Sequence, residues 1–96
     1  MREVLQIENV CLTAATETQR ESGFLGWVSL RLNSAVQLSG LMLRRTLHGR
    51  LTLSFPNRRD SHGREHFFIR PLDDHTRRDI EHQVFTALGL CQETQS

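Results

Sequence analysis

Apolar and polar residues alternate through the middle of this chain, and this alternation limits the folds that it can adopt. The segments 27–32 and 50–55 each place an apolar residue at every second position. Successive side chains of a strand point to opposite faces, so such segments are typical of strands with one buried and one solvated face. The apolar positions are Val28, Leu30, Leu32, Leu51, Leu53 and Phe55. We therefore predict an antiparallel sheet.

Between these two segments the alternation changes phase once. Val36 and Leu38 keep one phase, and Leu41 and Leu43 keep the other. A β-bulge inserts one extra residue into a strand and would return the second pair to the core face. We expect this bulge at Ser39–Gly40.

Further strands are expected at 4–15 and at 67–70, with a polar loop at 16–23. Short turns at 33–34 and 47–49 would link neighbouring strands, because Asn, Ser and Gly favour tight turns. The result is a meander of about five strands in sequence order, whose exposed edges need to be covered or paired.

After Pro71 the apolar period becomes helical. Asp73 or Asp74 can cap the N-terminus, and Gly89 would end the helix. The apolar positions at helical spacing are Ile80, Val84, Ala87 and Leu88. A helix of about fifteen residues is expected to pack on the sheet, followed by a tail at 89–96. The predicted fold class is α+β, as one domain spanning 1–96 with its core at about 4–88. One helix cannot cover a whole sheet, so we expect a homodimer formed through strands.

Composition excludes several classes of protein. At 38% hydrophobic and 24% charged residues the chain is globular, and its apolar stretches are far shorter than the ~20 residues that span a bilayer. Met1–Val4 contains no apolar signal segment, so we expect a cytoplasmic protein. Cys11 and Cys91 lack metal-ligand spacing and are expected to be reduced thiols.

The small net charge of +1 conceals a strong segregation of charge. Every acidic residue lies within 1–21 or 60–96. The segment between them is free of acids and carries Arg31, Arg44, Arg45, Arg50, Arg58 and Arg59. All 12 basic residues are arginine, whose guanidinium suits bidentate contacts to phosphate or guanine. A GC-rich genome would produce the same preference for arginine without any functional meaning.

The segment 56–71 is the most distinctive part of the chain. Pro56 ends a strand, Arg58 and Arg59 follow, Gly63 lies seven residues after Pro56, and Pro71 lies fifteen after it. This pattern resembles the stage V sporulation protein G family, also called septation regulators. The resemblance covers roughly residues 4–88, because Ile7–Leu12 and the helix start at Thr76, Arg77, Ile80 and Val84 also fit. The chain departs from the family pattern at Asp60–His62 and is more apolar at Phe67–Phe68.

The resemblance implies a small cytoplasmic bacterial homodimer, built by strand pairing, with nucleic-acid-binding and regulatory roles. It implies no enzymatic activity. We also expect no cofactor and no small-molecule substrate. Binding to DNA or RNA is expected to be weak and sensitive to salt, because the sequence pI of about 7.9 is low for a dedicated DNA-binding domain.

Arginines provide the candidate contacts to nucleic acid. On a turn, Arg58 and Arg59 could both reach one phosphate backbone, although a charged loop can also serve only to keep a sheet edge from aggregating. Asp74 can pair with Arg78 one helical turn away without excluding a phosphate contact. The predicted nucleic-acid-binding residues are Arg58, Arg59, Arg64, Arg77 and Arg78. The face that Arg44 and Arg45 occupy does not follow from the sequence.

Two other groups of residues favour simpler interpretations. Exposed aromatic residues on a sheet can stack on bases, but Trp27, Phe55, Phe67 and Phe68 fit packing in a core or an interface better. His62 and His66 stand four apart, a spacing that aligns metal ligands only on a helix, and Gly63 interrupts them. We therefore predict no metal site and no catalytic residue.

Three hypotheses about function remain. The first is a non-enzymatic nucleic-acid-binding regulator that acts as a homodimer. The second is a protein-interaction module whose arginines dock an acidic partner. The third, and the most distant, is a small hydrolase that uses His62 and His66.

Overall fold

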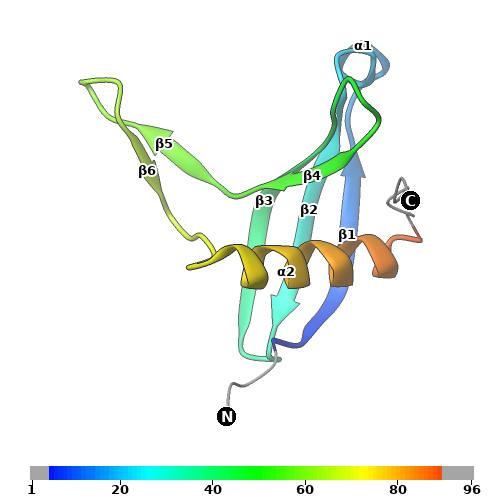
Figure 1. The fold of residues 1–96 in the computed structure, drawn as a ribbon, viewed down its shortest axis with the longest axis vertical. Coiled ribbons are helices and arrows are strands. Elements are labelled where there is room, and N and C mark those ends of the chain that lie inside the picture. Colours follow the sequence, from blue (N-terminus) through cyan, green and yellow to red (C-terminus); the bar gives the residue numbers. More distant parts are fainter. Residues whose placement is uncertain (1–4, 90–96) are drawn as a thin grey trace.

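The computed structural model describes residues 5–89. Its main element is a four-stranded antiparallel sheet in the order β1-β2-β3-β4 (Figure 1). The strands are β1 (Ile7–Ala14), β2 (Phe24–Leu32), β3 (Val36–Arg45) and β4 (Leu51–Ser54). Helix α2 (Asp74–Ala87) crosses this sheet. The predicted α+β class, with an antiparallel sheet and a C-terminal helix, is therefore confirmed.

A second, two-stranded sheet projects from the first as a hairpin (Figure 1). It consists of β5 (Asn57–Arg59) and β6 (Glu65–Phe67). The prediction of a last strand at 67–70 is wrong in its position and in its sheet: β6 comes earlier in the chain and pairs with β5. Pro56, which lacks a backbone N–H, separates β4 from β5.

The phase change in β3 is a β-bulge, as predicted. Val28 of β2 lies opposite Leu41, whereas Leu30 lies opposite Leu38, so β3 has one residue more than β2 between these pairs. Gly40 takes the extra position with φ +82°, a conformation that glycine adopts without strain. The bulge returns Leu41 to the buried face.

The segment 16–23 is not the loop that we predicted. It contains the short helix α1 (Glu17–Glu21), which starts with a capping box. Thr16 Oγ1 accepts a hydrogen bond from the backbone N of Gln19 at 3.2 Å, and Gln19 Oε1 accepts one from the backbone N of Thr16 at 3.0 Å. A threonine followed three residues later by a glutamine is the sequence signature of this cap, so it was visible in the sequence.

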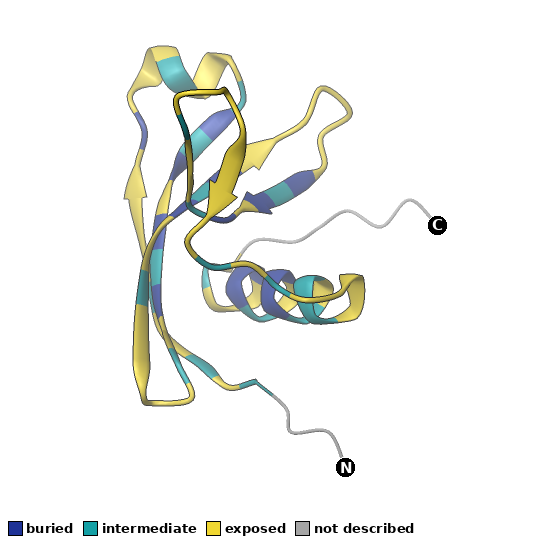
Figure 2. Cartoon of the chain, turned by 90° about the vertical axis from the view of Figure 1, so that its left-hand side faces the viewer, coloured by how far each residue is buried: buried dark blue, intermediate teal, exposed yellow. Residues whose placement is uncertain are grey.

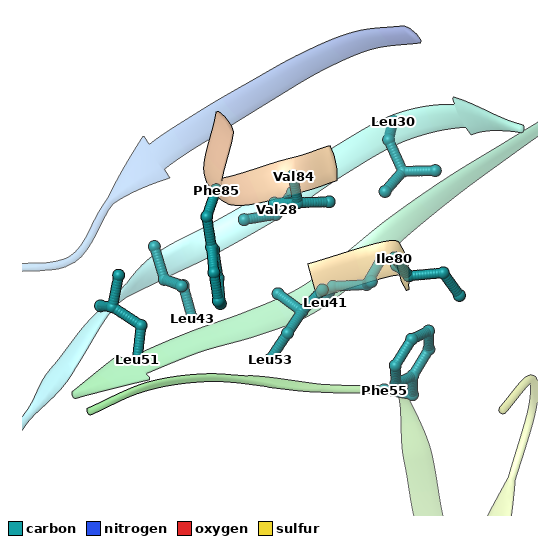
Figure 3. Close-up of a cluster of buried hydrophobic side chains, with 10 residues drawn as sticks. All are labelled: Val28, Leu30, Leu41, Leu43, Leu51, Leu53, Phe55, Ile80, Val84 and Phe85. Atoms are coloured by element: carbon teal, nitrogen blue, oxygen red, sulfur yellow. The ribbon is translucent and has the colours of Figure 1, made fainter. Parts of the chain in front are cut away.

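The core lies between α2 and one face of the four-stranded sheet. Figure 3 shows Ile80, Val84 and Phe85 of α2 directed towards the leucines of β2, β3 and β4. The buried cluster comprises Val28, Leu30, Leu41, Leu43, Leu51, Leu53, Phe55, Ile80, Val84 and Phe85. No described segment covers the opposite face of the sheet, which we call the outer face (Figure 2).

Side chains of α2 also bind the backbone of both edge strands. Glu81 Oε2 accepts a hydrogen bond from the backbone N of Leu53 in β4 at 3.1 Å. At the other edge, Gln83 Oε1 accepts from the backbone N of Ile7 at 3.1 Å, and Gln83 Nε2 donates to the carbonyl of Leu5 at 2.8 Å. Unpaired backbone groups at sheet edges can pair with other chains and cause aggregation. The hydrogen bonds from α2 satisfy some of these groups.

Helix α2 begins where the sequence predicted. Asp73 is the N-cap, and its Oδ1 accepts a hydrogen bond from the backbone N of Thr76 at 2.7 Å. Gly89 follows the helix with φ +73°. The predicted tail, apart from Gly89, lies outside the described residues. Within residues 5–89 no helix is long and apolar enough to cross a bilayer.

Candidate nucleic-acid interface

Asp60 organises the turn of the β5–β6 hairpin. Its Oδ1 accepts hydrogen bonds from the backbone N of His62 at 2.8 Å and of Arg64 at 2.9 Å. Its Oδ2 lies 2.8 Å from His66 Nε2 and 3.1 Å from Arg64 Nε. These contacts, the one with His66 foremost, hold the pKa of Asp60 below its usual value. Gly63 closes the turn with φ +78°.

Arg58 and Arg59 lie on strand β5, and not on the turn as we predicted. Neighbouring residues on a strand point to opposite faces, so the two guanidinium groups diverge. Arg58 lies opposite His66, and Arg59 lies opposite Glu65. The turn is shorter than predicted because Asp60 binds both the residues that follow it and His66 of β6.

Arg59 and Arg64 each have an acidic partner. Arg59 Nη2 lies 3.5 Å from Glu65 Oε1, and Arg59 Nη1 donates to the carbonyl of Gly63 at 3.4 Å. Arg64 Nε lies 3.1 Å from Asp60 Oδ2. Both arginines are exposed, so a phosphate could replace either carboxylate, but it would have to compete with it.

Arg58 differs from its neighbours because its guanidinium forms no ion pair or hydrogen bond with any described residue. The backbone N of Phe68 donates to the carbonyl of Pro56 at 3.0 Å, which continues the pairing of the hairpin beyond β6. By alternation, Phe68 then shares the face of His66 and Arg58, and its side chain is 69% exposed. We call Arg58, His66 and Phe68 the Arg58 face.

Arg77 and Arg78 lie on the first two turns of α2, as predicted. The predicted pair between Asp74 and Arg78 is present, with Arg78 Nε 2.8 Å from Asp74 Oδ2. Arg77 Nη2 binds Asp74 Oδ1 at 2.7 Å, and Arg77 Nη1 lies 3.4 Å from Glu81 Oε2. The hydrogen bond between Arg77 and Asp74 is the main reason why the pKa of Asp74 is lowered and that of Arg77 is raised.

The five predicted arginines do not form one cluster. Figure 1 shows the hairpin pointing away from α2, so Arg64 near its tip and Arg77 on the helix lie in different parts of the molecule. Four of the five have acidic partners, whereas Arg58 has none among residues 5–89. The structure therefore singles out Arg58, which the sequence did not separate from Arg59.

An aromatic cluster on the outer face was not predicted. The rings of Phe24 and Trp27 meet edge to face with their centroids 4.8 Å apart. The guanidinium carbon of Arg44 lies 5.2 Å from the centroid of Phe24, within the range of a cation–π contact. Trp27 is 39% exposed, so it does not belong to the core, whereas Phe55 is buried as predicted. The spacing of Phe24 and Trp27 carries no signal for this contact, because a bulge lies between them.

An apolar pocket of about 190 Å³ opens between the sheet and the start of α2. Among the residues within 5–89 that line it, only Arg70 is charged, and it is exposed. The other lining residues are Leu5, Ile7, Leu30, Leu32, Leu38, Phe55, Ile69, Pro71, Leu72, Thr76 and Ile80.

The histidines of the hairpin do not build a metal centre. His66 is bound to Asp60, and His62 Nδ1 lies 3.5 Å from Ser61 Oγ. The part of the chain that the structure describes contains no group of three potential metal ligands. Cys11 is an exposed free thiol, and Cys91 lies outside the described residues.

In comparisons with known proteins, no family model and no curated protein matches this chain. The resemblance to the stage V sporulation protein G family therefore depends on the residues quoted above, and it remains a prediction.

Proposed function

We propose that this protein is a non-enzymatic nucleic-acid-binding regulator, similar to stage V sporulation protein G, that acts as a homodimer through its arginine-bearing hairpin. The observation that carries the proposal is the Arg58 face. A guanidinium without an acidic partner among residues 5–89 shares one face of a projecting hairpin with the exposed Phe68. A phosphate at Arg58 displaces no carboxylate, and the neighbouring ring offers an apolar surface to a sugar or base.

The other four arginines play a secondary role in this proposal. Exposed ion pairs contribute little to stability, so Arg59, Arg64 and Arg78 can exchange their carboxylates for phosphates once the nucleic acid is bound. Arg77 exchanges less readily, because it also lies 3.4 Å from Glu81, which is buried. Each exchange leaves a carboxylate close to the bound phosphate, and the repulsion between them reduces the binding free energy gained from that contact. We therefore expect Arg58 to contribute most and the overall affinity to fall steeply with salt.

The hairpin also supports the homodimer. Every residue of β5 and β6 is exposed, and a two-stranded sheet that packs on nothing is marginally stable in water. Phe67, 46% exposed, lies opposite Asn57 and therefore on the face of Arg59. We propose that a second copy covers the Phe67 side of the hairpin, which leaves the Arg58 face free for nucleic acid.

The test is a titration of DNA and RNA binding at several salt concentrations. Arg58→Ala is expected to reduce the slope of log affinity against log salt by about one, because one phosphate contact is lost. Arg59→Ala is the matched control, since it removes the neighbouring guanidinium, and its slope should change less. Absence of binding to either nucleic acid at low salt would contradict the proposed function.

The apolar pocket favours the second hypothesis, a module that docks an acidic partner. A pocket of about 190 Å³ could take an apolar side chain of the partner, and Arg70 could bind an acidic residue next to it. Binding of such a partner would be weakened by Arg70→Ala and unaffected by Arg58→Ala. The two variants therefore separate this function from nucleic-acid binding.

A further inference from the structure

The outer face of the four-stranded sheet presents an exposed aromatic side chain at its centre. Trp27 of β2 lies opposite Thr13 of β1 and Met42 of β3, and Met42 lies opposite Ser54 of β4. These four residues form a row across the sheet. Trp27, Met42 and Ser54 alternate along their strands with buried residues, so the row lies on the outer face. Trp27 is the large aromatic side chain in this row, and its neighbours are small, polar or flexible.

The cluster around Trp27 limits the positions that its ring can take. Phe24 packs edge to face against it at an interplanar angle of 82°. Arg44 in turn lies over Phe24. A ring that is packed on one side and exposed on the other loses little further freedom when a ligand stacks on it.

Arginines flank Trp27 on the same face. Arg31 lies four residues along β2, which corresponds to roughly 13 Å, and by alternation it points to the same side. In the other direction Arg44 lies opposite Phe24, two residues along β3 from Met42, which is the partner of Trp27. The segment that forms β2, β3 and β4 contains no acidic residue. On β1, Glu8 lies opposite Arg31, and its Oε1 accepts a hydrogen bond from Ser34 Oγ, so a phosphate at Arg31 would lie close to this carboxylate. Positive charge on both sides of an exposed ring complements a phosphate backbone that crosses the face.

We propose that the outer face binds single-stranded nucleic acid, with Trp27 stacking on a base and with Arg31 and Arg44 contacting phosphates on either side of it. A flat sheet surface can contact only bases whose faces are free, and the bases of a duplex are stacked on one another. The single strand is therefore the form that this surface selects. The inference rests on the proposed nucleic-acid binding and adds a second surface, distinct from the Arg58 face.

The chain contains one tryptophan, so intrinsic tryptophan fluorescence reports on this surface alone. Single-stranded oligothymidine and oligouridine should quench the fluorescence of Trp27, and a duplex oligonucleotide of the same length should not. Trp27→Ala should weaken binding of the single strand by about fivefold or more, because a stacked base contributes strongly to affinity. Trp27→Phe, which keeps an aromatic ring, should lose less affinity for the single strand. Leu47→Ala, at an exposed turn away from the face, should bind the single strand as tightly as the parent protein.

Arg31→Ala provides a test that does not alter the aromatic cluster. It should reduce the salt slope for the single strand by somewhat less than one, as expected for a lost single-strand phosphate contact. Loss of single-strand affinity in both Trp27→Ala and Arg31→Ala, with an unchanged circular dichroism spectrum, would support the proposal.

Two other results would overturn it. If nucleic acid binds but the fluorescence stays constant and Trp27→Ala binds as tightly as the parent protein, the stacking surface is refuted while the Arg58 face stands. If the fluorescence changes with protein concentration and not with oligonucleotide, a second copy covers the outer face. Failure of all nucleic acids to bind at low salt refutes the proposed function and this inference together.

Discussion

Asp60 is the residue on which the geometry of the hairpin turn depends. Its carboxylate binds two backbone amides and the side chains of Arg64 and His66. Because these contacts favour the ionised form, the pKa of Asp60 lies below its ordinary value of 3.8. Ionised Asp60 therefore stabilises the folded hairpin at pH values well above 3.8, and this stabilisation is lost as the pH falls through the lowered pKa.

We expect the amide resonances of His62 and Arg64 to shift in an acid titration with a midpoint below 3.8. Measurement by NMR would show whether the turn opens as Asp60 takes up its proton. Asp60→Asn serves as the control, because its amide oxygen can still accept from the two backbone amides but carries no charge. The acid transition should vanish in this variant. A midpoint at or above 3.8 would contradict the assignment.

The arginines of the hairpin could be located from the sequence, but their different surroundings could not. Proline and glycine spacing placed Arg58 and Arg59 in the correct segment. An arginine of β5 has an acidic partner only if an acidic residue lies opposite it on β6. Which residues lie opposite one another depends on the length of the turn, and Asp60 sets that length. An error of one residue in that turn exchanges the two faces of a strand. The pattern of residue types alone could therefore not distinguish Arg58 from Arg59.

Among the secondary-structure elements, helix α2 was predicted well, but its polar contacts with the sheet were not. The cap at Asp73 and the apolar stripe depend on neighbours within a few residues. Glu81 contacts Leu53, 28 residues away, and Gln83 contacts Ile7, 76 residues away. Such contacts leave no local pattern in a sequence. The bulge at Gly40 could be predicted in part. The change of phase in the sequence indicates a shift of register, but it does not identify the partner strand.

Glu81 offers a test of the edge contacts at the level of the helix. Glu81→Ala leaves the backbone N of Leu53 without its acceptor, and an unsatisfied buried donor costs roughly 1–3 kcal/mol. Glu81→Gln keeps an oxygen that can accept this hydrogen bond and should cost less. Urea denaturation of the three proteins measures the difference. Equal destabilisation by both substitutions would show that the charge of Glu81, through its pair with Arg77, matters more than the bond to the edge strand.

At the scale of the whole molecule, each exposed surface of the hairpin and the sheet is proposed to bind a different partner. The Phe67 side of the hairpin is proposed to meet a second copy, the Arg58 face to meet phosphates, and the outer face to stack on single strands. Helix α2 packs on the remaining face of the sheet. The four-stranded sheet and helix α2 could be predicted from the sequence, because periodicity sets them, whereas the separate β5–β6 sheet was not predicted. The partners proposed for the surfaces of the molecule could not be predicted from the sequence, because they depend on the direction in which the hairpin projects.

Phe67 and Phe68 form a matched pair for testing the dimer. Phe67→Ser should weaken self-association by about tenfold or more, as expected for a buried aromatic residue at an interface. Phe68→Ser should leave self-association unchanged and weaken nucleic-acid binding. Sedimentation equilibrium over a range of protein concentrations measures the first effect. A protein that stays monomeric at all concentrations, or equal effects of the two substitutions, would contradict the proposed arrangement.

The edge contacts of α2 also bear on how the protein is made in the cell. All four strands of the main sheet leave the ribosome before the helix that carries Glu81 and Gln83. Until that helix is synthesised and docks, the amides of Ile7 and Leu53 have no side chain to bind. A nascent meander with open edges is prone to pair with other chains. The last part of the described chain to be translated is thus the part that closes the sheet against misassembly.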